Sequence, residues 1–295
     1  MIQKPMFSPQ TEWLPPESFP DLSKHDEIAI DLETKDPGLK TMGSGSVTGK
    51  GRIVGIALAV DNWSGYYPIA HEGGGNMDEK IVMDYFRTVL NLPARKIFHN
   101  AMYDVCFIRA AGLKINGEIV DTMIAGSLVD ENRFRYDLGS MGRDYLGRGK
   151  NEAVLNETAA IWGVDPKSEM YKLPAMYVGE YAERDAEMTL ELWQEMKKEI
   201  YAQDIEDIFK LETELFPCLV DMRFLGVRVD VEAASQLKHK LLTEEKECLQ
   251  KVQKETGVDT QIWAARSIAQ VFEKLRLPFD RTEKTNAPSF TKNFL

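Results

Sequence analysis

The sequence predicts an α/β fold, a sheet with helices packed around it, followed by a second and mostly helical region. The first observation is a set of three runs rich in β-branched and aromatic residues, which are typical of strands. The second is an alternation of helical and strand-like segments after them, up to about residue 200. The third is a change of character beyond about residue 205, where long amphipathic helices predominate. The three strand-like runs are 27–34, 52–60 and 65–70.

The remaining elements follow from periodicity and from the residues that end them. Gly112 closes the helix that begins after Asn100, because glycine at a helix end adopts the left-handed conformation readily. Residues 35–51, rich in glycine and lysine, form a flexible hairpin loop between the first two strands. The further strands expected are 95–100 and 117–122, and a series of helices follows them up to about residue 200. The further helices are 77–92, 101–113, 205–230, which ends in a short extended segment, 231–256 and 267–277.

Three regions are expected along the chain. Residues 1–24 form an extended tail, because five prolines exclude regular structure there. Residues 25–204 form the α/β domain, and residues 205–295 the helical region. We find no internal repeat in the sequence.

Composition is that of an ordinary soluble protein, with 43% hydrophobic and 28% charged residues. The three cysteines have no paired or ligand-like spacing, which argues against a disulfide framework and a zinc ribbon. No membrane span and no signal peptide is recognisable, so a cytoplasmic location is expected by default. The net charge of −11 disfavours a tight, sequence-specific binder of duplex DNA. It leaves open an enzyme that collects carboxylates to hold metal ions.

Asp31 and Glu33 end the apolar run IAIDLET, and both side chains point to the same side of the strand. Two like charges held together cost free energy unless a positive charge lies between them. One interpretation is a strand that runs out into a polar turn, and the other is a metal site.

Two further pairs of residues matter for that choice. Asn100 stands where it would cap a helix, with Asp104 in the first turn of that helix. Tyr181 and Asp185 lie one turn apart on a strongly periodic helix and therefore share a face. Taken alone, Asp104 is an acid that complements the helix dipole, and Tyr181 is a partly buried tyrosine on a surface helix.

Taken together, the three segments indicate a function far more specifically than any one of them does alone. They resemble the three motifs of the 3′–5′ exonucleases of the DEDD type that carry tyrosine in the third motif. The resemblance is to the proofreading domain of the DNA polymerase I family (family A), and it covers residues 27 to about 200. Further segments, 216–230, 265–279 and 283–290, resemble the start of the thumb region of the same polymerases.

The resemblance implies an RNase H-like fold, with a mixed central sheet flanked by helices, and a two-metal-ion mechanism. Asp31 would bridge two divalent cations, Mg²⁺ with Mn²⁺ as a substitute. Glu33 and Asp185 would complete the site that activates water, and Asp104 would hold the second ion, through water. Tyr181 would hydrogen-bond to and orient the attacking water, a role that suits a phenol better than that of a base.

Substrate contacts are also implied. Tyr103 and Asn100 match positions near the terminal nucleotide, where Tyr103 would stack or pack, although a core aromatic is an equal alternative. Thr34 would approach the 3′ end through its backbone. Asp121 is expected to cap the following helix and not to bind metal. The most cationic stretch near the motifs is the expected phosphate track, with a solvated surface as the alternative for each of its members: Arg133, Arg135, Arg143, Arg148 and Lys150.

The function expected is removal of mononucleotides from single-stranded or frayed 3′ DNA ends, in the service of proofreading. A polymerase domain, in the parent protein or as a separate chain, is the expected partner, and no polymerase activity is expected from this chain alone, because the palm and fingers regions are not recognisable in it. In a phage protein the location would be the host cytoplasm. One alternative is an exoribonuclease of the RNase D type. The other is a DNA-holding domain without catalysis, against which the presence of all five motif residues argues.

Overall fold

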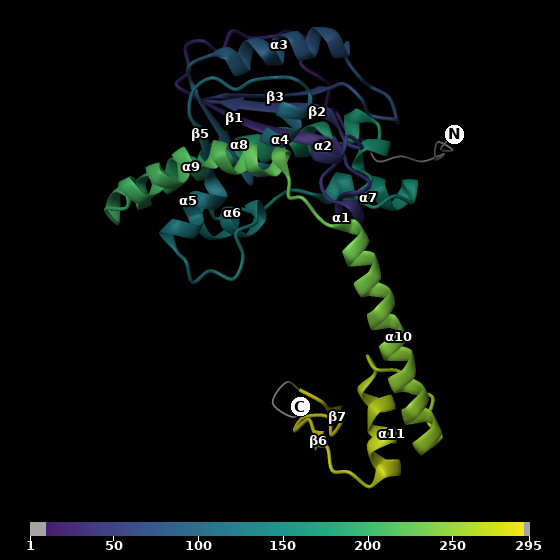
Figure 1. The fold of residues 1–295 in the computed structure, drawn as a ribbon. Coiled ribbons are helices and arrows are strands. Elements are labelled where there is room, and N and C mark those ends of the chain that lie inside the picture. Colours follow the sequence, from purple (N-terminus) through teal and green to yellow (C-terminus); the bar gives the residue numbers. More distant parts are fainter. Residues whose placement is uncertain (1–9, 292–295) are drawn as a thin grey trace. The chain divides into compact units, whose positions relative to one another are not determined.

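The structure, a computed structural model, describes residues 10–291 of the chain (Figure 1). Its main sheet is mixed and has five strands in the order β3-β2-β1-β4-β5. β1 is central: it pairs antiparallel with β2 and parallel with β4. The strands are β1 (Glu27–Lys35), β2 (Arg52–Val60), β3 (Trp63–Pro68), β4 (Arg95–Phe98) and β5 (Ile119–Asp121).

The helices that accompany the sheet come in the expected order. α5 to α7 and two 3-10 turns lie between β5 and the long helix α8, in the series of helices expected there. Their bounds are α1 (Leu39–Met42), α2 (Gly45–Thr48), α3 (Glu79–Asn91), α4 (Ala101–Ala110), α5 (Thr122–Val129), α6 (Leu138–Leu146), α7 (Ala153–Trp162), η1 (Met170–Lys172), η2 (Ala175–Tyr177) and α8 (Gly179–Ala202).

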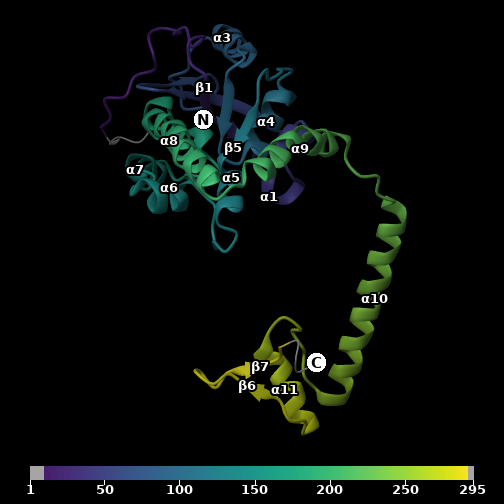
Figure 2. The ribbon, with the colours of Figure 1, turned by 90° about the vertical axis from the view of Figure 1, so that its left-hand side faces the viewer.

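The sheet separates two apolar cores. Successive residues of β1 point to opposite faces, so Ile28, Ile30 and Leu32 pack with α3 and α4 on one side. Ala29 packs on the other side, in the core that includes the buried face of α8. In the view of Figure 2, α8, α6 and α7 lie on one side of the sheet and α4 and α9 on the other. Asp31 and Glu33 have the parity of Ala29 and therefore belong to the face that α8 covers.

These elements confirm the α/β prediction with a mixed sheet flanked by helices. The expected hairpin loop at 35–51 does join two antiparallel strands, but it contains the single helical turns α1 and α2. Residues 10–24 contain no helix or strand, as their prolines indicated; they nevertheless pack against the sheet through Leu22, which is buried in its core. The first nine residues of the expected tail lie outside the described residues.

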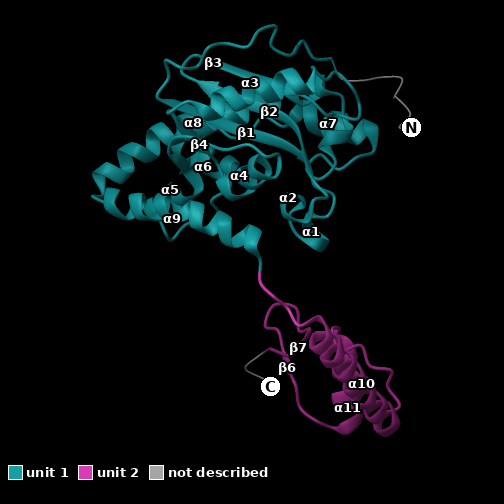
Figure 3. Ribbon diagram, turned by 45° about the horizontal axis from the view of Figure 1, so that its top comes forward, with its two compact units in different colours: residues 1–226 teal, residues 227–295 magenta. Residues whose placement is uncertain are grey.

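The chain divides into two compact units, Met1–Gly226 and Val227–Leu295 (Figure 3). The helix α9 (Glu206–Leu225) lies in the first unit, because its Phe216 and Val220 are buried in the core that contains α3 and α4. The expected boundary at residue 205 thus falls inside this unit. The second unit consists of α10 (Val231–Thr256), α11 (Ala265–Leu275) and a short hairpin of β6 (Asp280–Arg281) and β7 (Pro288–Ser289).

In the described part of the chain, no helix combines the length and the apolar character that a membrane crossing requires.

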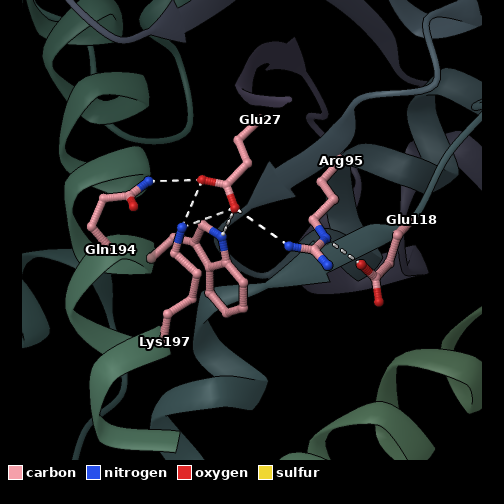
Figure 4. A network of polar contacts seen from close by, with 6 residues as sticks. Glu27, Arg95, Glu118, Gln194 and Lys197 are labelled. Atoms are coloured by element: carbon pink, nitrogen blue, oxygen red, sulfur yellow. Dashed lines mark hydrogen bonds and ion pairs between the residues drawn. The ribbon is translucent and has the colours of Figure 1, made fainter. Parts of the chain in front are cut away.

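A polar network fixes α8 along β1 (Figure 4). Glu27, the first residue of β1, accepts hydrogen bonds from Trp193 Nε1 at 2.9 Å and from Lys197 Nζ at 2.8 Å. Gln194 Nε2 donates to the same carboxylate at 2.9 Å. Burial raises the pKa of Glu27, but these donors hold it below its usual value, so the group stays ionised. The network determines which residues of α8 reach the other end of β1.

Candidate active site

The end of β1 places Asp31 and Glu33 side by side on the face toward α8. Both side chains are partly buried. Glu33 lies opposite Gly55 of β2, and the register of the pair shifts between Glu33 and Thr34. An irregularity of this kind bends the strand and redirects the side chains beside it.

Asp104 reaches the same place from α4. Its side chain is 4% exposed, and Oδ1 accepts a hydrogen bond of 3.2 Å from the backbone N–H of Leu32, the residue between the two acids of β1. This bond ties the first turn of α4 directly to β1. Three carboxylates from two elements are thereby brought together.

The cap expected of Asn100 is made by a different residue. Asn100 is the N-cap of α4, but its φ of 64° is left-handed and its side chain makes no capping bond. The carboxylate of Asp121 instead accepts from the backbone N–H groups of Asn100 and Ala101, at 2.9 and 2.8 Å. Asp121 also accepts from Met123 N at 2.9 Å and so caps α5, as expected. The cap of α4 comes from a neighbouring strand, which local sequence rules do not cover.

α8 contributes Tyr181 and Asp185, and a lysine joins them. Asp185 is 3% exposed and forms an ion pair with Lys150. The ammonium of Lys150 also donates to the Tyr181 hydroxyl at 3.1 Å and lies 5.2 Å from the centre of the tyrosine ring. Lys150, expected on the phosphate track, is thus the cation of the carboxylate cluster.

Electrostatics confirm that the acids act on one another. Burial raises the pKa of Asp31 from 3.8 to about 7, and the charge of Asp185 adds to the effect, whereas Lys150 opposes it. Burial likewise raises the pKa of Glu33 and of Asp104, with a further contribution from the charge of Asp31 in each case. Burial raises the pKa of Tyr181 too, so its hydroxyl stays protonated at neutral pH. Ionising the whole cluster requires added positive charge.

Thr34 and Tyr103 lie together beside the cluster. Their hydroxyl oxygens are 2.7 Å apart, and Tyr103 also donates to Oδ2 of Asp36 at 3.4 Å. Because the Tyr103 proton goes to Asp36, Thr34 is the donor in the first bond. Asp36 is itself held by the backbone N–H of Gly45 in the loop after β1. Tyr103 is therefore fixed in place, with its ring against Phe107 at 5.0 Å.

The other basic residues of the expected track do not gather at the carboxylates. Arg133 pairs with Asp144 at 2.7 Å, and Arg148 pairs with Glu191 at 2.5 Å. Arg143 donates to Ser140 Oγ at 3.1 Å, and Arg135 is exposed. Among these five residues, Lys150 is the one that contacts Tyr181 and Asp185. A phosphate track over the other four stays a prediction.

Comparison with known proteins gives the family. Residues 8–201 match the family model described as "3'-5' exonuclease" of family A DNA polymerases. The chain belongs to this 3′–5′ exonuclease family. It is also 31% identical over 309 aligned residues to a DNA-directed DNA polymerase of Pseudomonas phage M6, an alignment that covers 100% of this chain and 46% of that protein. The chain thus spans about half the length of this polymerase relative.

Solved structures agree on the fold. The POL domain of Pol1 from M. smegmatis, in complex with DNA primer-template and dNTP, has a TM-score of 0.59 and 15% identity. The match covers 91% of this chain and 41% of that one. Brucella melitensis NrnC with bound Mg²⁺ has a TM-score of 0.50 and 16% identity, over 72% of this chain and 92% of the other. The expected RNase H-like fold is confirmed.

The residues at the exonuclease site fit divalent cations by the type of their donors. Hard cations such as Mg²⁺ take carboxylate oxygens and water, and the site brings together carboxylates whose charges act on one another. Lys150 stands in for such a cation, since its ammonium already neutralises part of the cluster. Within residues 10–291, no three Asp, Glu, His or Cys side chains are arranged to hold a metal ion as they stand. An added cation would compete with the Lys150 ammonium for Asp185.

Sequence reasoning missed a buried pair behind the site. The Tyr66 hydroxyl lies 2.6 Å from Nε2 of His71, whose Nδ1 lies 3.0 Å from the Leu173 carbonyl oxygen. Burial lowers the pKa of His71 to about 4, so the ring is neutral: Nδ1–H donates to Leu173 and Nε2 accepts from Tyr66. A Cβ at Gly55 would lie 2.0 Å from the Tyr66 oxygen, so the tyrosine fits because Gly55 has no side chain. His71 lies in the loop after β3, and no pattern in the sequence indicates that its ring turns back to pair with Tyr66.

Lys150→Met should destabilise the metal-free exonuclease. The change removes the cation from a cluster of buried carboxylates, and we expect a loss of about 2 kcal/mol, below the usual cost of breaking a buried pair because the lysine is 24% exposed. In saturating Mg²⁺ the loss should shrink. Melting temperatures with EDTA and with Mg²⁺ measure both. Arg148→Met, which breaks the exposed pair with Glu191, is the control and should change little. Equal losses for Lys150→Met in the two conditions would contradict the prediction.

The metal-free exonuclease should also lose stability as the pH rises from about 4 to about 7. A carboxyl group with a raised folded-state pKa binds protons in the folded chain that the unfolded chain has already released, so folding is favoured at low pH. This advantage disappears as the pH passes the folded pKa, about 7 for Asp31. Unfolding in EDTA at pH 5 and pH 8 should show a smaller difference for Asp31→Asn than for the wild type. An identical difference would exclude Asp31 from the cluster.

Proposed function

We propose that this chain is a metal-dependent 3′–5′ exonuclease that hydrolyses the terminal phosphodiester of single-stranded or frayed DNA and releases deoxynucleoside monophosphates. The observation that carries the proposal is the convergence of Asp31, Glu33, Asp104 and Asp185 with Tyr181, from three elements, in a chain of the 3′–5′ exonuclease family. Because its relatives include a DNA polymerase about twice its length, we propose that the activity serves proofreading beside a polymerase domain.

The four carboxylates would hold two divalent cations, Mg²⁺ in our proposal, with Mn²⁺ as a substitute. When bound, such cations generate a nucleophile from water at neutral pH and neutralise charge at the attacked and leaving oxygens. The charge of Asp31 raises the pKa of Glu33 and of Asp104, and the charge of Asp185 raises that of Asp31, so we propose that Asp31 would contribute to holding both ions. The hydrogen bond from Leu32 N orients Asp104, which would hold the second ion.

Tyr181 and Lys150 would act on the reacting groups. The protonated Tyr181 hydroxyl can donate to or accept from the attacking water and fix its direction toward phosphorus, while the bond to the 3′ oxygen of the preceding nucleotide breaks. If a metal ion took over Asp185, the Lys150 ammonium would be free to pair with a phosphate oxygen of the substrate. Thr34 and Tyr103, locked together by their hydroxyls, would form the wall against which the terminal nucleotide rests.

Incubation with single-stranded DNA labelled at its 5′ end, with and without Mg²⁺, tests the proposal. We expect a ladder that shortens from the 3′ end in Mg²⁺ and an intact strand in EDTA. An intact strand in both would overturn the proposal. An RNA oligomer of the same sequence, run in parallel, distinguishes deoxyribonuclease from ribonuclease activity, because faster cleavage of RNA would contradict the DNA substrate.

Asp31→Ala and Asp185→Ala should each abolish cleavage while the fold survives, because each removes a ligand and at the same time relieves repulsion among the carboxylates. The rate should fall at least tenfold, equivalent to ~1.4 kcal/mol of barrier, and far more if both ions are lost. Asp61→Ala, at an exposed turn acid of the same unit, is the control. Steady-state cleavage and circular dichroism are the measurements. A variant with more than about a tenth of the wild-type rate would remove that residue from the ligand set.

Tyr181→Phe should lower kcat by roughly 10- to 1,000-fold, the range for one lost positioning hydrogen bond, and leave metal binding intact. Calorimetric titration with Mn²⁺ checks the metal, and single-turnover cleavage checks the chemical step. Tyr85→Phe is the matched control, because it deletes a hydroxyl that donates to the Pro20 carbonyl at 2.9 Å, away from the carboxylates. Unchanged turnover in Tyr181→Phe would place this tyrosine outside the site.

A further inference from the structure

Residues 10–22, which we call the N-terminal strap, pack against other parts of the first unit. The second half of the strap is anchored away from the carboxylates: the ring of Phe19 stacks on that of Tyr67 at 5.3 Å and contacts that of Tyr85 at 4.9 Å. The Tyr85 hydroxyl donates to the Pro20 carbonyl oxygen at 2.9 Å. The region that matches the family model begins at residue 8 and so includes the strap. The strap is therefore part of the exonuclease domain.

The first half of the strap contacts the helix that carries Tyr181 and Asp185. The indole of Trp13 lies directly on Gly179, the first residue of α8: a Cβ there would lie 2.0 Å from Cε2 of the indole and 2.3 Å from Cδ2. No side chain larger than hydrogen fits at that position without displacing the tryptophan. Trp13 thus touches the backbone of α8 two residues before Tyr181.

Trp13 also contacts β3, through Tyr66. The rings of Trp13 and Tyr66 are 5.9 Å apart at 54°. Tyr66 is fully buried, and its hydroxyl lies against Gly55, the residue opposite Glu33 in the sheet. The backbone N–H of Tyr66 donates to Glu183 of α8 at 2.9 Å. Trp13 therefore fills the corner where β3 meets the first turn of α8.

The first turn of α8 needs such a contact. Its far half is fixed by the Glu27 network, through Trp193, Gln194 and Lys197. Its beginning follows two 3-10 turns, starts with a glycine, and has no side-chain cap among the described residues. A helix end without a cap frays unless packing holds it.

We propose that Trp13 is a positioning residue of the exonuclease site, which holds the first turn of α8, and with it Tyr181, in the place where the tyrosine acts. The proposal rests on the proposed function for its effect on rate. Trp13 contacts neither the carboxylates nor Lys150 and acts only through α8. Its removal leaves a space over Gly179 into which the first turn can shift, and a displacement of about 1 Å at a reacting group costs up to 100-fold in rate.

The test compares Trp13→Ala and Trp13→Phe with Phe19→Ala, a change at the far anchor of the same strap. Trp13→Ala should lower kcat about tenfold at a temperature where the variant is folded, with little change in the KM for single-stranded DNA. Trp13→Phe, which keeps a ring over Gly179, should recover most of the rate. Phe19→Ala should lower the melting temperature about as much as Trp13→Ala does, but it should leave kcat unchanged. Equal losses of kcat in Trp13→Ala and Phe19→Ala would overturn the proposal, and so would a wild-type kcat in Trp13→Ala.

A double-mutant cycle with Tyr181→Phe tests whether Trp13 affects the rate through Tyr181. If Trp13 acts through the tyrosine, Trp13→Ala should have little further effect in the Tyr181→Phe background. Fully multiplicative losses would show that Trp13 acts elsewhere.

Hydrogen exchange separates this inference from the proposed function. The amides of residues 183–187, the first that can bond within α8, should exchange faster in Trp13→Ala than in the wild type and in Phe19→Ala. This result is expected even if the wild type cleaves no DNA, an outcome that would overturn the exonuclease proposal alone. Unchanged exchange in Trp13→Ala would overturn the positioning role.

Discussion

Repulsion among buried carboxylates is the constraint on which this structure depends. Asp31, Glu33, Asp104 and Asp185 are gathered from β1, α4 and α8, and burial raises the pKa of each. At Asp31, Glu33 and Asp104 the charges of other acids in the cluster add to this effect. Such a cluster is stable only with a positive charge inside it or with some of its members protonated. In this structure the charge is the ammonium of Lys150. The chain itself thus supplies the charge that neutralises part of the cluster.

The same constraint explains why the surroundings are so firmly fixed. Carboxylates that repel one another would move apart if their elements could slide. Glu27 fixes the far half of α8 to the start of β1, Asp104 ties α4 to Leu32, and Asp121 holds the beginning of α4. Each of these bonds joins residues of different elements, at least 20 positions apart in the chain. Lys150, by contrast, lies on the loop after α6.

Much of the fold was predictable because its signals are local. The apolar, strand-like runs 27–34 and 52–60 and the helical period of 77–92 and 101–113 predicted β1, β2, α3 and α4. The helical turns within 35–51 were not predicted, since their conformation depends on Asp36 and its bond to Gly45 N. The place of α9 depends on where Phe216 and Val220 find a core, and local periodicity does not say which core that is.

For the site, the sequence by itself determined the candidate residues, because a strand of period two and a helix with a period near four place Asp31 with Glu33 and Tyr181 with Asp185 on common faces. The resemblance of three spaced motifs joined them to Asp104. Only the tertiary structure decided what neutralises them and what holds them. Three contacts between residues far apart in the chain show this. Lys150, and none of the other four basic residues, pairs with Asp185; Asp121 caps α4 in place of Asn100; and Trp13 packs over Gly179. Such contacts follow from packing and charge in three dimensions, and no spacing in the sequence specifies them.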